Sequence, residues 1–111
     1  MKRGDIFFAA LDPTRGSEIQ KTRPVVIVSN DAANRASSLV TVLPLTSNVR
    51  TVYPFEVKLM AAGTGLAMDG KAMAQQVRTI DKSRLGSNRR GVISPEKMRL
   101  LDDALRLHLA L

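Results

Sequence analysis

The feature that most constrains this chain is a run of four β-branched residues, Val25-Val26-Ile27-Val28, which directly follows Pro24. β-Branched side chains are restricted at χ1 and are enriched in strands. An apolar run without polar alternation is typical of a strand that is buried on both faces. The sequence therefore predicts a central strand at residues 25–28, with the rest of the chain built around it.

Several shorter strand patterns accompany this run. Residues 4–11 alternate and end at Asp12-Pro13, and residues 39–45 and 53–59 alternate in the same way. Residues 68–80 predict one or two further strands, interrupted near Asp69-Gly70, which is a strong hairpin signal. We also expect a turn with one helical turn within residues 29–38.

The C-terminal segment has a different pattern, that of a helix. Ser94-Pro95-Glu96 predicts an N-cap, a proline at the first helical position and an acidic first turn, and the helix should run to about Leu109. The helix carries two apolar stripes, one for the core and a second that faces either a second subunit or a broad core. The two stripes are Met98, Leu101, Leu105 and Leu109, and Leu100, Ala104, Leu107 and Leu111.

Short strands and one terminal helix predict a mainly β fold, a small curved antiparallel sheet or barrel. No repeat or linker divides the sequence, so we expect one domain over residues 1–111.

Charge is the first functional indication. Seventeen Lys and Arg against ten Asp and Glu give a net charge of +7, spread along the chain. Such a surplus attracts polyanions, either a nucleic acid or an acidic protein segment. Cysteine is absent, which excludes disulfides and thiolate metal sites and fits a reducing cytoplasm. No apolar stretch has the length of a signal peptide or of a membrane span, so we expect no membrane partner.

The usual catalytic motifs are missing. The sequence has no Walker lysine, no His-Glu-x-x-His and no Gly-x-Ser-x-Gly, and its one histidine, His108, lies near the end of the predicted helix. Carboxylates do not occur at metal-ligand spacing, so we expect neither a metal nor another cofactor. The remaining candidate is the polar loop of residues 12–22, because a loop of this length in a small domain is often functional.

Four motifs then carry a resemblance to a known family. They are Asp12-Pro13-Thr14-Arg15-Gly16-Ser17-Glu18 followed by Arg23-Pro24, then Pro44-Leu45-Thr46-Ser47, Tyr53-Pro54-Phe55-Glu56-Val57, and Gln76-Val77-Arg78-Thr79-Ile80-Asp81 followed by Arg84-Leu85. In this order and spacing, along the whole chain, they resemble the MazF (PemK-type) family of bacterial toxins. The resemblance implies a dimeric SH3-like β-barrel of the CcdB/MazF type that cleaves single-stranded RNA without a metal, leaving 2′,3′-cyclic phosphate and 5′-hydroxyl ends.

The resemblance also assigns site residues. By similarity Arg23 is the central catalytic residue and Thr46 the second, Arg23 acting through the charge of a guanidinium that binds phosphate. The alternative for Arg23 is a surface ion pair with Glu18, and Arg78 could pair with Asp81 instead of a phosphate. The expected substrate-binding residues are Glu18, Lys21, Ser47, Gln76 and Arg78.

The chain departs from the family at several positions. Ile19 and Lys21 stand where many relatives have glutamine and glycine, which puts base specificity of the loop in question. Gln75 replaces a carboxylate, and Met73 replaces an arginine found in one branch. Only the version of the site with Arg23 and Thr46 is available to this chain.

Three functions follow as hypotheses. The first is a ribonuclease toxin held inactive by a cognate antitoxin whose acidic disordered tail lies on the basic groove. The second is a CcdB-type gyrase poison, which would bind its protein target through the terminal helix and would need neither Arg23 nor Thr46. The third is a non-catalytic RNA-binding barrel.

Overall fold

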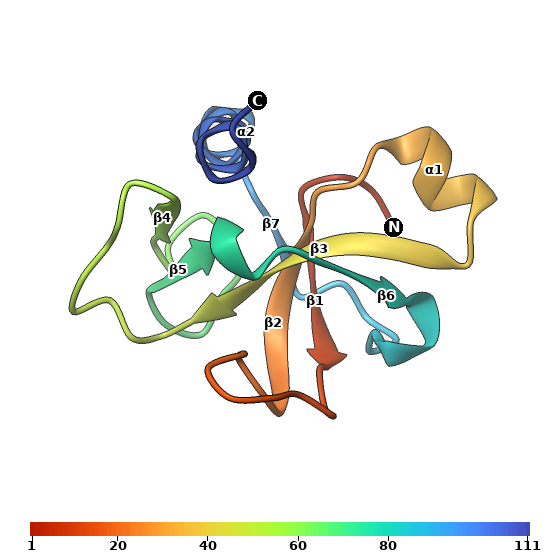
Figure 1. Cartoon of the computed structure of the whole chain (residues 1–111). Coiled ribbons are helices and arrows are strands. Elements are labelled where there is room, and N and C mark those ends of the chain that lie inside the picture. Colours follow the sequence, from red (N-terminus) through yellow and green to blue (C-terminus); the bar gives the residue numbers. More distant parts are fainter.

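A computed structural model describes all of residues 1–111, and Figure 1 shows the chain as a curled sheet with one long helix against it. The helices are α1 (Asp31–Ala36) and α2 (Pro95–Leu109), with 3₁₀ turns η1 (Ala74–Gln76) and η2 (Lys82–Arg84). The strands are β1 (Asp5–Ala10), β2 (Thr22–Ile27), β3 (Leu39–Thr46), β4 (Glu56–Leu59), β5 (Gly70–Met73), β6 (Arg78–Asp81) and β7 (Gly91–Val92).

All strand pairs are antiparallel. The sheet has seven strands in the order β4-β5-β3-β2-β1-β7, and β6 pairs with the other part of the long strand β3. Because β3 pairs with β5 at one end and with β6 at the other, the sheet curls into an open half-barrel. The predicted mainly β fold with a C-terminal helix is therefore confirmed.

Strand β2 is buried on both faces, as its β-branched run predicts. Val26 belongs to the core cluster under α2, whereas Val25 and Ile27 belong to a second cluster on the opposite face. All three side chains are fully buried, and each contributes about 1.5–3 kcal/mol through removal from water. The sheet is thus the middle layer between two cores.

Helix α2 covers the first of these cores. Its N-cap Ser94 accepts a hydrogen bond from the backbone N–H of Lys97, and Ala110 ends it in the left-handed conformation. The buried side chains are Met98, Leu101 and Ala104, so the core contact takes residues from both predicted stripes. The exposed remainder comprises Leu100, Leu107, Leu109 and Leu111. No helix in the structure combines the length and apolar character required to cross a bilayer.

Some boundaries were predicted incorrectly. Strand β4 begins at Glu56, three residues later than the alternation from Tyr53 indicated. Asp69-Gly70 forms no two-residue hairpin, because Gly70 pairs with Leu59 and the connection spans residues 60–69. The two strands within residues 68–80 are separated by η1 instead. Strand β7 was not predicted, since two residues are too short for a periodic pattern.

A buried carboxylate was also not predicted. In the sequence Glu56 alternates with the apolar residues Phe55 and Val57, a pattern typical of a solvated strand position, yet it is only 6% exposed. Its Oε1 accepts hydrogen bonds from Lys71 Nζ (2.8 Å) and the Tyr53 backbone N–H (3.0 Å), and its Oε2 accepts one from Gln75 Nε2 (2.7 Å). Burial raises the pKa of Glu56, but these hydrogen bonds and the charge of Lys71 outweigh it and lower the pKa below its ordinary value.

Stability should therefore fall in acid through Glu56. A carboxyl with a lowered pKa in the folded chain contributes stability above its unfolded pKa of about 4.3, and this is lost as the pH falls through the folded pKa. We expect Glu56→Gln to cost about 3–5 kcal/mol at pH 7, because Lys71 then stays buried without its partner. Urea unfolding from pH 7 to pH 2.5 should show the difference between wild type and variant shrinking below about pH 4.3. Parallel pH profiles would contradict this assignment.

Candidate active site

The register of three strands brings the two predicted catalytic residues to the same edge of the sheet. In β1 and β2 Phe8 pairs with Pro24 and Ala9 with Arg23, and in β2 and β3 Val25 pairs with Pro44. Because the strands are antiparallel, the start of β2 lies beside the end of β3. Arg23 and Thr46 are therefore neighbours in space, although they lie 23 positions apart in the sequence.

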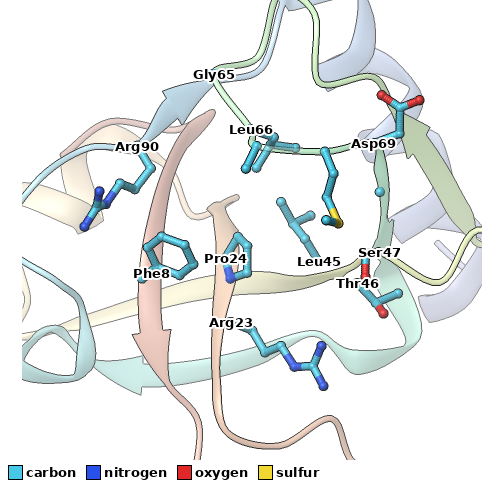
Figure 2. A pocket seen from close by; sticks show the side chains of 13 residues that line it. Phe8, Arg23, Pro24, Leu45, Thr46, Ser47, Gly65, Leu66, Asp69 and Arg90 are labelled. Atoms are coloured by element: carbon cyan, nitrogen blue, oxygen red, sulfur yellow. The ribbon is translucent and has the colours of Figure 1, made fainter.

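Both residues line a groove of about 370 Å³. Its floor is a row of apolar side chains across three adjacent strands, namely Phe8, Pro24 and Leu45, and its roof is the segment of residues 65–69. Figure 2 shows the guanidinium of Arg23 extending toward the side on which Thr46 and Ser47 lie, with Arg90 and Phe8 at the other side. The groove thus combines an apolar middle with polar ends.

The roof is fixed by close contacts at glycines. Gly65 has φ +87°, and a Cβ there would lie 2.7 Å from the carbonyl oxygen of Arg90. At the other end, a Cβ on Gly70 would lie 2.7 Å from the carbonyl oxygen of Thr46. Leu66 packs on the core cluster under α2. The roof therefore has a defined position above the floor, and only glycine allows the backbone to approach so closely.

One nitrogen of the Arg23 guanidinium already forms a hydrogen bond within the chain. Its Nε donates to the carbonyl oxygen of Gln20 at 3.1 Å, which orients the group, and its two Nη atoms form no hydrogen bond within the chain. The expected alternative, an ion pair with Glu18, is wrong. Glu18 instead accepts a hydrogen bond from the backbone N–H of Arg15 at 2.5 Å, so the outer edge of Arg23 is free for a ligand.

Thr46 ends β3 with its hydroxyl at the groove. The hydroxyl oxygen accepts a hydrogen bond from the backbone N–H of Asn48 at 3.3 Å and donates to no group of the chain. Ser47 follows it, exposed and also lining the groove. Two hydroxyl donors thus stand beside the free edge of Arg23.

Two of the predicted RNA-binding residues, Gln76 and Arg78, hold the loop between β1 and β2 through hydrogen bonds. Gln76 accepts a hydrogen bond from the N–H of Ile19 (3.0 Å) and donates to the carbonyl of Ser17 (3.1 Å). Arg78 Nη1 donates to the carbonyl of Leu11 at 3.2 Å, so its alternative partner Asp81 is not used. Ile19 packs on the second core cluster. These contacts make residues 11–21 an anchored loop.

Lys21 occupies a strained position in this loop. Its φ is +70°, in the left-handed region, where a residue with a Cβ costs about 1–3 kcal/mol. This conformation gives a physical reason for the glycine that the family resemblance associates with the position. The backbone N–H of Lys21 donates to Asp12 Oδ1 at 3.1 Å, and its carbonyl accepts from Leu11. The exposed ammonium extends the positive charge around the loop.

The predicted site residues therefore fall into two groups. Arg23, Thr46 and Ser47 share the groove. The others lie about the anchored loop, where Glu18, Gln76 and Arg78 line a second hollow of about 420 Å³ and Lys21 lines neither. Phe8 and Arg90 line the groove as well, and neither was predicted from the sequence. A strand alternation cannot reveal that one aromatic residue stays 37% exposed.

Comparisons with known proteins agree with this geometry. Residues 2–109 match the family model of PemK-like, MazF-like toxins of type II toxin–antitoxin systems. The chain therefore belongs to this toxin family. It is 47% identical over its whole length to 98% of endoribonuclease MazF9 of Mycobacterium tuberculosis, and 38% identical over its whole length to 96% of endoribonuclease EndoA of Bacillus subtilis.

A solved structure shows the same fold. An endoribonuclease in complex with its cognate antitoxin from a mycobacterial species superposes with a TM-score of 0.83 at 29% identity. The match covers all of this chain and 96% of that chain. The curled sheet and terminal helix are therefore those of MazF-type toxins.

The anchoring role of Gln76 can be tested by hydrogen exchange. We expect Gln76→Ala to speed exchange of the Ile19 amide about 10-fold, because one lost hydrogen bond is worth about 1–1.5 kcal/mol. Amides of β2 should be unaffected. Gln20→Ala is the matched control, since the Gln20 side chain forms no hydrogen bond. Unchanged exchange at Ile19 in Gln76→Ala would show that the Gln76 hydrogen bond does not anchor this part of the loop.

Proposed function

We propose that this toxin is an endoribonuclease that cuts single-stranded RNA in the groove whose floor is formed by β1, β2 and β3. The observation that carries the proposal is the free edge of the Arg23 guanidinium beside the Thr46 hydroxyl on one apolar groove. The relatives named endoribonuclease match the chain over its full length. Residues 1–111 would act as one toxin domain.

The reaction is attack by a ribose 2′-hydroxyl on the adjacent phosphate. The 2′-oxygen bonds to phosphorus while the bond to the 5′-oxygen breaks. One proton leaves the 2′-hydroxyl and one joins the 5′-oxygen, so the products carry a 2′,3′-cyclic phosphate and a 5′-hydroxyl. The phosphorane-like transition state concentrates negative charge on the phosphate oxygens, where fixed donors are most effective.

Arg23 supplies the charge at this point. An arginine pKa above about 12 keeps the side chain cationic and unsuited to act as a base at neutral pH. Its two Nη groups form a planar fork that matches two phosphate oxygens. Because Nε is already bonded to Gln20, little rotamer freedom is lost when the phosphate binds.

Thr46 supplies a neutral donor. Its hydroxyl oxygen accepts from the backbone N–H of Asn48, which leaves the hydroxyl proton available for donation to a phosphate oxygen. Ser47 adds a second hydroxyl at the same edge. Around the anchored loop, Glu18, Lys21, Gln76 and Arg78 would contact the rest of the RNA, Lys21 through phosphate and Gln76 through the amide atoms that its loop contacts leave unused.

The partners follow from charge and exposed apolar surface. A net charge of +7 attracts RNA and, equally, the acidic tail of an antitoxin, and the solved relative bound to its cognate antitoxin supports the second. The exposed leucines of α2 fit a homodimer, which would bury them.

We place the protein in the cytoplasm, where its RNA substrate occurs. A gyrase poison acting through the terminal helix would need neither Arg23 nor Thr46, and the full-length relatives are named endoribonucleases, which favours cleavage over passive RNA binding.

Substitution of Arg23 tests the proposal. We expect Arg23→Ala to lower the cleavage rate at least about 100-fold, the scale of removing one donor to a charged transition state. Arg23→Lys should be intermediate, because it keeps the charge without the fork. The assay is cleavage of a long single-stranded RNA in excess EDTA, with chemical identification of the fragment ends.

Two controls complete the experiment. Arg99→Ala removes one exposed charge on α2, outside the groove, and should cut normally. The melting temperature of Arg23→Ala should match wild type, since the Arg23 side chain forms only one hydrogen bond and the backbone pairing with β1 is retained. Intact RNA after incubation with wild type at low salt would refute the ribonuclease proposal, and toxicity retained in Arg23→Ala would favour a gyrase poison.

A further inference from the structure

The groove extends well beyond the two proposed catalytic residues. Arg23, Thr46 and Ser47 occupy one end, and Arg90 occupies the other end beside Phe8, where the apolar floor begins. The cleavage chemistry uses only the first part. The second therefore has no role in the function proposed above.

Phe8 is unusual among the residues of β1. Ile6, Phe7 and Ala9 are buried, whereas Phe8 leaves 37% of its surface exposed, in the groove. It begins the row that continues through Pro24 and Leu45. A flat aromatic ring that stays in contact with water beside a phosphate-binding group is the type of surface on which unpaired bases stack.

Arg90 is a cation without a carboxylate partner. Its guanidinium lies 5.1 Å from the centre of the Phe8 ring, and its side chain forms no hydrogen bond or ion pair. The neighbouring Arg89, by contrast, pairs with Asp5. The backbone of Arg90 is held firmly, because its N–H donates to the carbonyl of Ile6 at 2.7 Å. A fixed backbone thus presents a free guanidinium at the end of the groove.

The segment of residues 65–69 borders this part of the groove. Gly65 brings residues 65–69 against the carbonyl of Arg90, so the roof and Arg90 are positioned together. Met68, 62% exposed, adds a flexible apolar side chain above the floor. Asp69 is the one carboxylate on the groove, and it is bonded to the N–H of Ala61 at 2.7 Å.

We infer that Phe8 and Arg90 form a nucleotide subsite, which holds the base of one nucleotide flanking the cleaved phosphate while Arg90 binds the next phosphate along the strand. The apolar floor from Phe8 to Leu45 suits a base, and the guanidiniums of Arg23 and Arg90, neither of which is paired with a carboxylate, suit the phosphates on either side. This inference rests on the proposed ribonuclease function and extends it to sequence selection, because a base that contacts both the floor and residues 65–69 is discriminated by its size and shape.

The test couples a protein change to a base deletion. The substrate is a short oligoribonucleotide with one site that wild type cleaves. In two derivatives, the nucleotide on the 5′ or on the 3′ side of the cleaved phosphate lacks its base but keeps its ribose and 2′-hydroxyl. Values of kcat and KM are measured for wild type, Phe8→Ala and Phe8→Leu on all three substrates.

At one of the two positions, base deletion should lower the wild-type kcat/KM about 10- to 100-fold, the range for loss of one stacked base. At that same position the deletion should change Phe8→Ala less than about 3-fold, because the stacking partner is already absent. Phe8→Leu should behave like Phe8→Ala if the ring face is what matters. Equal losses in wild type and Phe8→Ala at both positions would overturn the inference.

Arg90 is tested by salt dependence. One phosphate contact on single-stranded RNA contributes about −0.7 to the slope of log affinity against log salt. Arg90→Gln should reduce the slope of kcat/KM by about this amount. Arg99→Gln, which removes an exposed arginine outside the groove, should leave the slope unchanged. Equal slopes for wild type and Arg90→Gln would contradict the phosphate contact.

The outcomes separate this inference from the proposed function. If wild type cuts no RNA, the proposed function fails and the subsite fails with it. If wild type cuts RNA and the Phe8 and Arg90 variants cut at the wild-type rate with wild-type base dependence, only the subsite is wrong. If Phe8→Ala and Arg90→Gln bind an acidic antitoxin peptide more weakly but cleave RNA as wild type does, the subsite is also wrong. That result would favour a protein-binding groove.

Discussion

The pairing of β2 with β1 on one side and β3 on the other determines most of this structure. Burial of Val25, Val26 and Ile27 on alternating faces requires one core on each face of the sheet. A shift of the β2 register by one residue would move each of these side chains to the opposite face. The same register sets Phe8 opposite Pro24 and places the start of β2 beside the end of β3. The apolar run that stabilises the fold therefore also decides which polar residues meet at its end.

The groups proposed for chemistry are supported by backbone rather than by other charged side chains. Arg23 is oriented by the carbonyl of Gln20, and the loop that provides this carbonyl is anchored through Gln76 and Ile19. On the other side, close approach at Gly65 and Gly70 fixes the roof of the groove. Such an arrangement preorganises donors before the substrate arrives and leaves the guanidinium without a competing carboxylate. The ion pair between Arg23 and Glu18 does not form, because the Glu18 carboxylate accepts the backbone N–H of Arg15 within the loop.

Much of the fold could be predicted from the sequence, because the strong signals are local. The β-branched run, the Ser94-Pro95 helix start and the alternation in β3 each predict their element. The family motifs identified Arg23 and Thr46 as candidate site residues although they are far apart in the sequence. The sheet register brings them to the same groove. Contacts that depend on tertiary structure were missed. Glu56 looks like a surface residue until Lys71 is brought beside it, and Gln76 looks like a free side chain until residues 17–19 fold against it.

The most direct test of this account is a structure of the chain bound to an oligonucleotide that it cannot cleave, with a 2′-deoxyribose at the cleavage position. We predict that the phosphate at that position lies between the free edge of Arg23 and the Thr46 hydroxyl, with a flanking base on the row formed by Phe8, Pro24 and Leu45. A phosphate bound instead in the hollow lined by Glu18, Gln76 and Arg78, remote from Thr46, would contradict the central claim that this groove is the active site.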